Sequence, residues 1–147
     1  MIPPNPWAHQ NAIKTLYAKC MEKTCEIHRI TRMELDILLF LANNPLYDTA
    51  TDIIEIRYLS KSQVSSSVKL LEQSGYIRKE YADSNRKTAH LKLCDKAAAI
   101  IRDGHLGQEK FLSVMLNGFS GEELDHMKRY NSRILHNINI YLRETER

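Results

Sequence analysis

The sequence predicts a mainly α-helical fold with one small β-hairpin. Apolar side chains recur at helical spacing through most of the chain, and pairs of residues three apart that are typical of helix starts stand at four places. Those capping pairs are Thr31 with Glu34, Thr49 with Asp52, Ser60 with Gln63, and Ser120 with Glu123. Alternation with a period of two is confined to residues 76–93, where we expect two strands. The length of 147 residues suits a single domain.

The composition is that of a globular protein. Hydrophobic residues make up 43% and charged residues 27% of the chain, which excludes collagen-like and disordered classes. The longest apolar run, Ile37–Ala42, is far shorter than the ~20 residues that span a bilayer, and the N-terminal residues do not resemble a signal peptide. Three cysteines are an odd number that fits a reducing compartment. We therefore expect a cytoplasmic protein.

The first half of the chain is predicted to form four helices. They cover residues 7–28, 31–43, 49–59 and 60–74. The last three begin at capping pairs, and the second ends because Pro45 cannot continue a helix. The break at Ser60 separates a short helix from the helix that follows it.

A hairpin is predicted next. Residues 76–81 and 90–93 alternate between apolar and polar side chains, as strands do. The polar segment Ala82–Ala89 lies between them, and we expect it to project as a long loop rather than to close tightly.

Two helices are predicted after the hairpin. Asp95 is expected to cap a long helix that continues to Phe119, with Gly104 and Gly107 loosening or bending it. Ser120 is expected to begin the last helix.

This order of helix, short helix, helix and hairpin predicts a winged helix-turn-helix, in which the second helix of the pair enters the major groove of DNA. We expect an N-terminal dimerisation helix over 1–30, a DNA-binding unit over 31–94 and C-terminal dimerisation helices over 95–147, in one compact chain. Charge supports that use of the middle unit. Residues 55–92 hold eight basic and four acidic side chains, whereas the two flanking segments are close to neutral. A local basic surplus is expected where a surface meets phosphates.

The helix that begins at Ser60 has a chemistry suited to DNA. Its serines are small, which lets a helix axis approach base edges, and each hydroxyl can donate or accept a hydrogen bond. Serine is a poor helix former, so helix stability does not explain their number. The predicted DNA contacts are Ser60, Lys61, Ser62, Gln63, Ser65, Ser66, Lys69, Arg86 and Lys87. Ser67 is a further small residue that is expected to allow close approach.

Several of these residues have a second interpretation. Gln63 could bind adenine or complete the capping box, and Lys61 and Lys69 could bind phosphates or only water. Arg86 and Lys87 near the hairpin tip have little folding role, whereas arginine suits a narrow minor groove. Arg78 and Lys79 lie on opposite strand faces, so at most one is expected to face DNA.

The run LSKSQVSSSVKLLEQSGYIRKEYADSNRKTAHLKL, within residues 31–93, resembles the MarR family of bacterial transcriptional regulators. The resemblance lies in a leucine-serine pair that opens the recognition helix, a leucine-glutamate pair near its end, a glycine, and an aspartate shortly before the wing arginine. It implies a homodimer that reads a pseudo-palindromic site and regulates genes, commonly as a repressor relieved by a small phenolic or lipophilic effector. It also implies that Arg86 is the wing arginine, braced by Asp83. The tip departs from the family pattern, and Cys94 replaces a threonine.

The flanking helices independently predict a dimer, because a unit of about 65 residues cannot bury all their apolar stripes. A second copy would bury them and place two recognition helices about 34 Å apart; a helical appendage in a monomer is the alternative. The predicted dimerisation residues are Ile13, Leu16, Leu124, Met127, Ile134, Ile138 and Tyr141.

Other chemistry finds weaker support. Cys20 lies beside Tyr17 and could sense oxidants, but a buried cysteine more often acts as a small hydrophobe. Cys25 and His28 could be half of a metal site, but no second pair accompanies them, so we expect neither metal nor cofactor. The histidines form no catalytic constellation, so an enzyme is not expected. A winged helix that binds protein is the remaining alternative. Residues suggested for an effector pocket, or equally for the core or an interface, are His105, Tyr130, Asn131 and Tyr141.

Overall fold

The computed structural model describes residues 5–146 and confirms a mainly helical fold with one hairpin. Its elements are α1 (Pro6–His28), α2 (Arg32–Asn43), α3 (Ala50–Arg57), α4 (Lys61–Gln73), β1 (Ile77–Ala82), β2 (Asn85–Leu93), the 3-10 helix η1 (Asp95–Ala97), α5 (Ala98–Met115) and α6 (Gly121–Thr145). Residues 1–4 and 147, at the outer ends of the predicted dimerisation segments, lie outside the described residues. Within the described range, no helix combines the length and the apolar character needed to cross a membrane.

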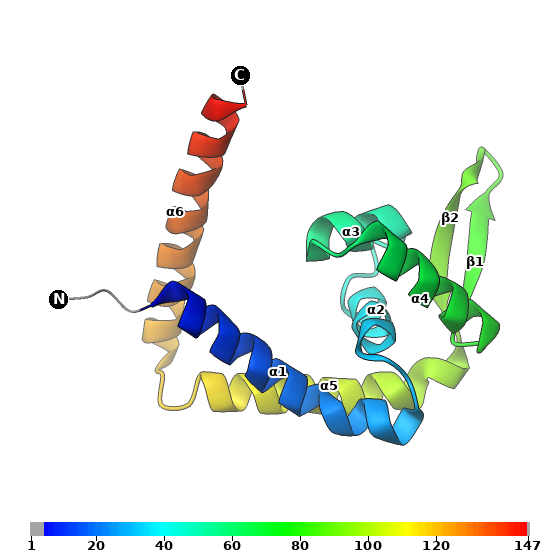
Figure 1. The fold of residues 1–147 in the computed structure, drawn as a ribbon, viewed down its shortest axis with the longest axis horizontal. Helices are drawn as coiled ribbons and strands as arrows, with labels where there is room; N and C mark the ends of the chain where they lie inside the picture. The colour runs from blue at the N-terminus through cyan, green and yellow to red at the C-terminus, as the bar shows by residue number, and fades with distance from the viewer. Residues whose placement is uncertain (1–4, 147) are drawn as a thin grey trace. The chain divides into compact units, whose positions relative to one another are not determined.

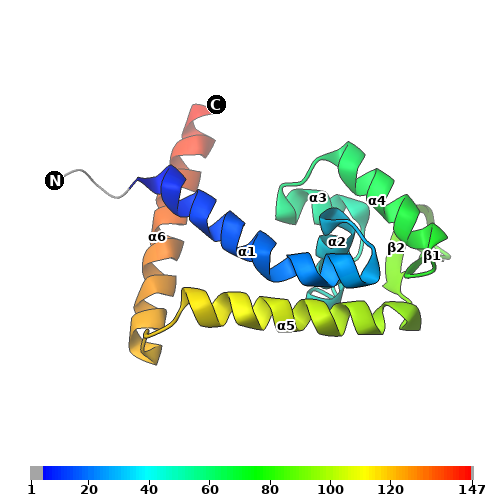
Figure 2. The ribbon, with the colours of Figure 1, turned by 60° about the horizontal axis from the view of Figure 1, so that its bottom comes forward.

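The chain groups into two compact units, residues 1–112 and residues 113–147. The first unit contains α1 to α4, the hairpin and most of α5. In it α1 and α5 lie side by side in both views, and the hairpin packs beside α4 (Figures 1 and 2). The second unit contains the end of α5 and all of α6.

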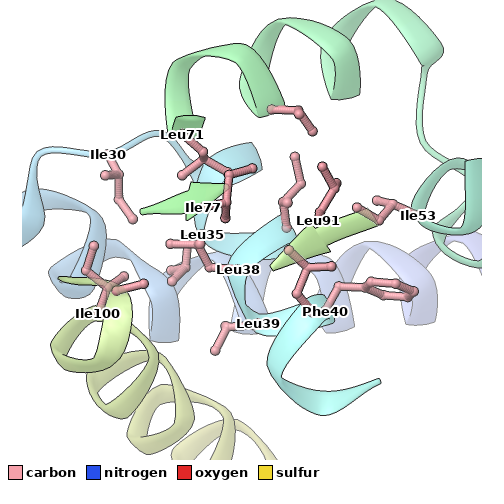
Figure 3. Close-up of a cluster of buried hydrophobic side chains, with 14 of the residues drawn as sticks. Ile30, Leu35, Leu38, Leu39, Phe40, Ile53, Leu71, Ile77, Leu91 and Ile100 are labelled. Atoms are coloured by element: carbon pink, nitrogen blue, oxygen red, sulfur yellow. The ribbon is translucent and has the colours of Figure 1, made fainter. Parts of the chain in front are cut away.

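The core of the first unit is built around α2 (Figure 3). This helix is apolar on nearly all sides and is buried from Glu34 to Leu41. Around it pack buried side chains from every neighbouring element: Ile53 of α3, Val64, Val68 and Leu71 of α4, Ile77 of β1, Leu91 of β2 and Ile100 of α5. Because α4 and the hairpin both rest on this core, the core determines which faces of α4 and of the hairpin remain outside.

The predicted helix starts are confirmed. At Thr31, Thr49 and Ser120 both bonds of the capping box form. At Ser60 the structure has one of the two, from the Gln63 backbone N–H to Ser60 Oγ at 3.2 Å.

The prediction of a long loop at the hairpin tip is wrong. The strands continue to Ala82 and resume at Asn85, which pair across a two-residue turn. Between this pair and the Glu80–His90 pair the register is irregular, with residues 86–89 of β2 opposite residue 81 of β1. Asn85 organises the tip, because its Oδ1 accepts hydrogen bonds from the backbone N–H groups of Lys87 and Thr88 and its Nδ2 donates to Thr88 Oγ1. These local bonds satisfy backbone N–H groups in the stretch of β2 for which the strand register has no partner in β1.

The prediction that Gly104 and Gly107 bend the following helix is also wrong, because α5 runs through both without a break. They are positions of close helix approach. A Cβ on Gly104 would lie 2.8 Å from a Leu39 methyl, and one on Gly107 would lie 2.7 Å from the Cys20 carbonyl oxygen. Asp95 lies in the preceding 3-10 turn rather than capping α5, and Phe119 lies beyond the end of α5.

Candidate nucleic-acid interface

The junction between α3 and α4 is a tight helix-turn-helix. Tyr58 follows the last residue of α3 in the left-handed region, with φ 54°, and the Leu59 N–H bonds to the Ile54 carbonyl at 3.2 Å. Ser60 then caps α4. A bulky residue at positive φ is a strained choice, and the Tyr58 side chain is 92% exposed. The junction redirects the chain so that α4 presents a separate face.

The outer face of α4 carries the predicted contact residues. Ser62, Ser65, Ser66 and Lys69 are exposed and lie within an arc of about 100° at 3.6 residues per turn. We call these four residues the serine stripe. Exposed Lys61 and Gln63 flank it on its two sides.

Two features differ from the sequence interpretation. Ser67 is buried, so it belongs to the inner side of α4 and not to the contact surface. Leu70, expected beside the apolar face, is half exposed. Sequence spacing alone does not fix the boundary between the buried and exposed faces of a helix. Each residue is rotated by about 100° from the one before it, so residues near the boundary can lie on either side.

The hydroxyls of the stripe differ in their availability. Ser60 Oγ accepts from Gln63 and lies 3.1 Å from Ser62 Oγ, so Ser60 acts as a cap and engages Ser62. In the part of the chain that the structure describes, the hydroxyls of Ser65 and Ser66 form no hydrogen bond. These two groups are therefore available to a ligand on the outer side of α4.

The hairpin tip presents Arg86 and Lys87. The Arg86 side chain is 77% exposed, and its Nη2 lies 3.5 Å from Asp83 Oδ1, at the outer limit for a hydrogen bond. An ion pair this exposed stabilises little, so Asp83 only weakly restrains Arg86. Arg86 and Lys87 are adjacent and exposed, in the stretch of β2 for which the register has no partner in β1.

The basic side chains of residues 55–92 divide into those that have an acidic partner and those that have none. Five of the eight cations have an acidic partner within 4 Å: Arg57 with Asp36, Arg78 with Glu80, Lys79 with Glu72, Arg86 with Asp83, and Lys92 with Asp48. The other three are Lys61 and Lys69 of α4 and Lys87 near the tip. Among residues 5–146, Arg86 makes only the long contact above, and these three lysines make no ion pair. The unneutralised charge thus lies on α4 and at the tip.

The hairpin is joined to the helical body through Asp48, in the loop before α3. Its Oδ1 lies 2.7 Å from His90 Nδ1, its Oδ2 accepts from Lys92 Nζ at 2.8 Å, and its backbone carbonyl accepts from the Leu91 N–H at 2.8 Å. Burial raises the pKa of Asp48, but the hydrogen bonds and charges of Lys92 and His90 outweigh burial and hold that pKa below its usual value. Sequence reasoning missed Asp48, because its partners lie more than forty residues away.

A second surface feature is a groove of about 830 Å³ in the first unit. Its lining comes from α1, the start of α2, the end of α3, the junction to α4, and α5: Ile13, Lys14, Tyr17, Ala18, Arg32, Arg57, Tyr58, Leu59 and Phe111. We call this the Tyr17 groove. It combines cationic and aromatic side chains, a combination suited to a flat anionic ligand.

Tyr17 is held firmly at this groove. Its ring lies edge-on to Phe111 at 5.1 Å, with the Arg32 guanidinium 4.5 Å above it, and its hydroxyl accepts from Gln108 Nε2 at 3.0 Å. Arg32 in turn donates to the buried Asp36 at 2.9 Å. Contacts from α2 and α5 therefore converge on this side chain of α1.

The residues that the sequence suggested for an effector pocket lie elsewhere. His105 bonds to Asn43 at 2.8 Å and lines a different surface. Tyr130, Asn131 and Tyr141 are exposed on α6. The residues of the Tyr17 groove were missed because they come from four separate segments, which only folding brings together.

Taken by itself, α6 is an amphipathic helix with no buried residue. Of its predicted dimerisation residues, Ile134, Ile138 and Tyr141 are at least half exposed, and Leu124 and Met127 are half-buried. The predicted α1 residues, Ile13 and Leu16, are half-buried as well.

The thiols and metal-ligating groups are dispersed. Cys20, Cys25 and Cys94 are free and half-buried. Burial raises the pKa of Cys25, the Arg32 cation lowers it, and the Asp36 and Glu34 carboxylates raise it, with the net pKa above the ordinary value. His28 bonds to Asp103 of α5 at 2.7 Å. Within the described range, no three His, Cys, Asp or Glu side chains are placed to hold a metal ion.

Comparison with known proteins agrees with this geometry. Residues 29–87 match the model of the MarR family. A relative, the HTH-type transcriptional regulator PecS of Dickeya dadantii (strain 3937), is 24% identical over 127 residues, which are 83% of this chain and 75% of PecS.

Solved structures share the fold. A MarR-family regulator from Listeria monocytogenes, solved with a 26-mer DNA, superposes with a TM-score of 0.77 at 17% identity over 93% of this chain and 90% of that one. CouR from Rhodococcus jostii RHA1, solved with p-coumaroyl-CoA, gives 0.69 at 12% identity over 86% of each chain. With the matched segment and the winged helix-turn-helix geometry, these comparisons show that the chain has the fold of MarR-family transcriptional regulators and is similar to that family over residues 29–87.

Proposed function

We propose that the protein is a cytoplasmic, sequence-specific regulator that binds double-stranded DNA as a homodimer, reads a pseudo-palindromic operator and represses transcription until a small effector binds. In this proposal the serine stripe enters the major groove, and Arg86 reaches the adjacent minor groove. Lys61, Lys69 and Lys87 bind backbone phosphates.

One observation carries the DNA-binding part of the proposal. Within residues 55–92, the cations that make no ion pair are Lys61 and Lys69 of α4 and Lys87 near the tip, where Arg86 has only an exposed 3.5 Å contact with Asp83. Among residues 5–146, the Ser65 and Ser66 hydroxyls on the same helix form no hydrogen bond. Folding alone has no use for such an arrangement, whereas phosphates and base edges would satisfy it. The DNA-bound Listeria relative supports the same use of the fold.

The dimer is proposed from the apolar side of α6. Ile134, Leu135, Ile138 and Tyr141 are each at least half exposed along one helix, an arrangement that monomers rarely leave uncovered. A second copy offers a matching stripe. Ile138→Asp is expected to convert the dimer to a monomer in analytical ultracentrifugation, and Arg133→Ala on the polar side of α6 is expected to leave the dimer intact.

The effector is proposed to bind in the Tyr17 groove. Lys14, Arg32 and Arg57 supply positive charge, and the aromatic rings supply flat apolar surface, so an aromatic or acyl compound with an anionic group fits. The CouR relative was solved with an anionic aromatic thioester, which agrees with this class. A ligand there would contact Arg57 at the end of α3 and so couple to the helix-turn-helix.

Arg86→Ala tests the DNA-binding proposal. Loss of a groove-inserted arginine is expected to weaken operator binding by about 1 to 3 kcal/mol and to reduce the salt slope by about one unit per arginine, or about two per dimer. Arg133→Ala removes the same charge from α6 and is the matched control. The assay is fluorescence anisotropy over a salt series, with the operator obtained by selection. Equal salt slopes and affinities for wild type and Arg86→Ala would refute the proposal.

A further inference from the structure

The contacts of Asp48 have an unusual distribution. One residue in the loop before α3 binds three consecutive residues of β2, through both carboxylate oxygens and through its backbone carbonyl. The Asp48 side chain is only 16% exposed. Asp48 therefore connects the hairpin to the helical body that carries α4, and little of its side chain is open to solvent.

The same face of the hairpin carries a ladder of charges. His90 is paired in register with Glu80, and Lys92 is paired with Arg78, so these four side chains share a face. Arg78 donates to Glu80 at 2.8 Å, within β1. Asp48 contributes the carboxylate that connects this ladder to the loop before α3.

We propose that Asp48 is a positioning residue for DNA recognition: by holding His90 and Lys92 it sets the direction of the hairpin and thereby the reach of Arg86. This inference rests on the proposed function. It goes beyond that function because it assigns a recognition role to a residue that would not touch DNA.

Geometry shows why the base of the hairpin controls its tip. The Ala82–Asn85 pair at the tip stands two β1 residues beyond the Glu80–His90 pair, which is about 7 Å at about 3.4 Å per residue. A rotation of about 10° at His90 would then move the tip by about 1 Å, which is enough to break a hydrogen bond.

The direction of the change in DNA affinity on substitution of Asp48 distinguishes a positioning role from a purely electrostatic one. Replacing Asp48 by Asn removes a negative charge, and net charge alone then predicts tighter binding to DNA. Asn keeps one oxygen, which can accept from Lys92 Nζ, and places an amide N–H group against His90 Nδ1. The attraction of the carboxylate for the Lys92 ammonium is then lost, and so is the contact with His90 wherever Nδ1 carries the proton. Positioning predicts weaker binding.

The experiment is a double-mutant cycle measured by fluorescence anisotropy on the selected operator. Asp48→Asn is expected to weaken binding by about three- to tenfold, and Arg86→Ala by about tenfold. The double variant is expected to bind like Arg86→Ala alone, because Asp48 acts through Arg86. Asp125→Asn, an exposed carboxylate on α6, makes the same charge change and is expected to leave binding unchanged or slightly tighter.

A second variant guards against a folding defect. His90→Phe removes one contact of Asp48 while leaving the carboxylate in place, and it is expected to weaken binding in the same non-additive way. Each of Asp48→Asn and His90→Phe is combined with Arg86→Ala in a cycle. If Arg86→Ala weakens binding, then multiplicative losses in both cycles, or unchanged DNA binding by Asp48→Asn, would overturn the inference. If Arg86→Ala itself bound normally, the proposed function would fail instead.

Discussion

Substitution of Gly107 by Ala tests the close approach of α5 and α1. Gly107 lies inside α5, where alanine is favoured by helix propensity by about 1 kcal/mol. A Cβ there would stand 2.7 Å from the Cys20 carbonyl oxygen and 2.5 Å from Met21 Cε, whereas ordinary contact begins at 3.4 Å. The methionine methyl can rotate away, but the carbonyl moves only if α1 moves.

Overpacking costs about 1 to 3 kcal/mol, and a clash with a backbone carbonyl belongs to the upper half of that range. After the gain of about 1 kcal/mol in propensity, we expect Gly107→Ala to lower the free energy of unfolding by about 1 to 2 kcal/mol. The assay is urea unfolding followed by circular dichroism at one fixed protein concentration, because dimers gain stability with concentration. Gly121→Ala is the matched control, since nothing lies within 4 Å of its added Cβ. A Gly107→Ala protein as stable as wild type would show that the helices do not meet as described.

Three further predictions concern the sites. Ser66→Leu is expected to weaken operator binding at least tenfold without lowering the melting temperature, because leucine blocks the stripe but favours the helix; a parallel fall in both would contradict this. The pKa of Asp48 is lower in the folded state than in the unfolded chain. The ionised carboxylate therefore stabilises the fold above the ordinary carboxyl pKa, and this stabilisation is lost as pH falls through the folded-state pKa. The unfolding free energies of wild type and Asp48→Asn are expected to differ at neutral pH and to converge in acid. The raised pKa of Cys25 predicts slower alkylation by iodoacetamide at pH 7 than in the urea-unfolded chain, as peptide mass spectrometry can measure.

Local chemistry made much of the fold predictable. Capping pairs such as Thr31 with Glu34 specify helix starts through bonds within four residues, so they can be read from sequence. The outer face of α4 followed from its apolar spacing at Val64, Val68 and Leu71.

Features that depend on distant segments could not be read in the same way. From the sequence alone, a glycine within a helix indicates flexibility. In the structure, the absence of a side chain at Gly104 leaves room for Leu39 to pack against the helix. The tight turn at the tip depends on bonds from the Asn85 side chain, which polarity alone does not indicate. The roles of Asp48 and Tyr17 likewise arise from partners that only the folded chain brings near.

The most direct test of the account is selection of bound sites from random duplexes by the purified dimer. A regulator that presents two serine stripes to one face of the double helix is expected to enrich an inverted repeat whose half-site centres lie about 10 base pairs apart. Enrichment of no sequence, or of a single unpaired half-site, would contradict the account.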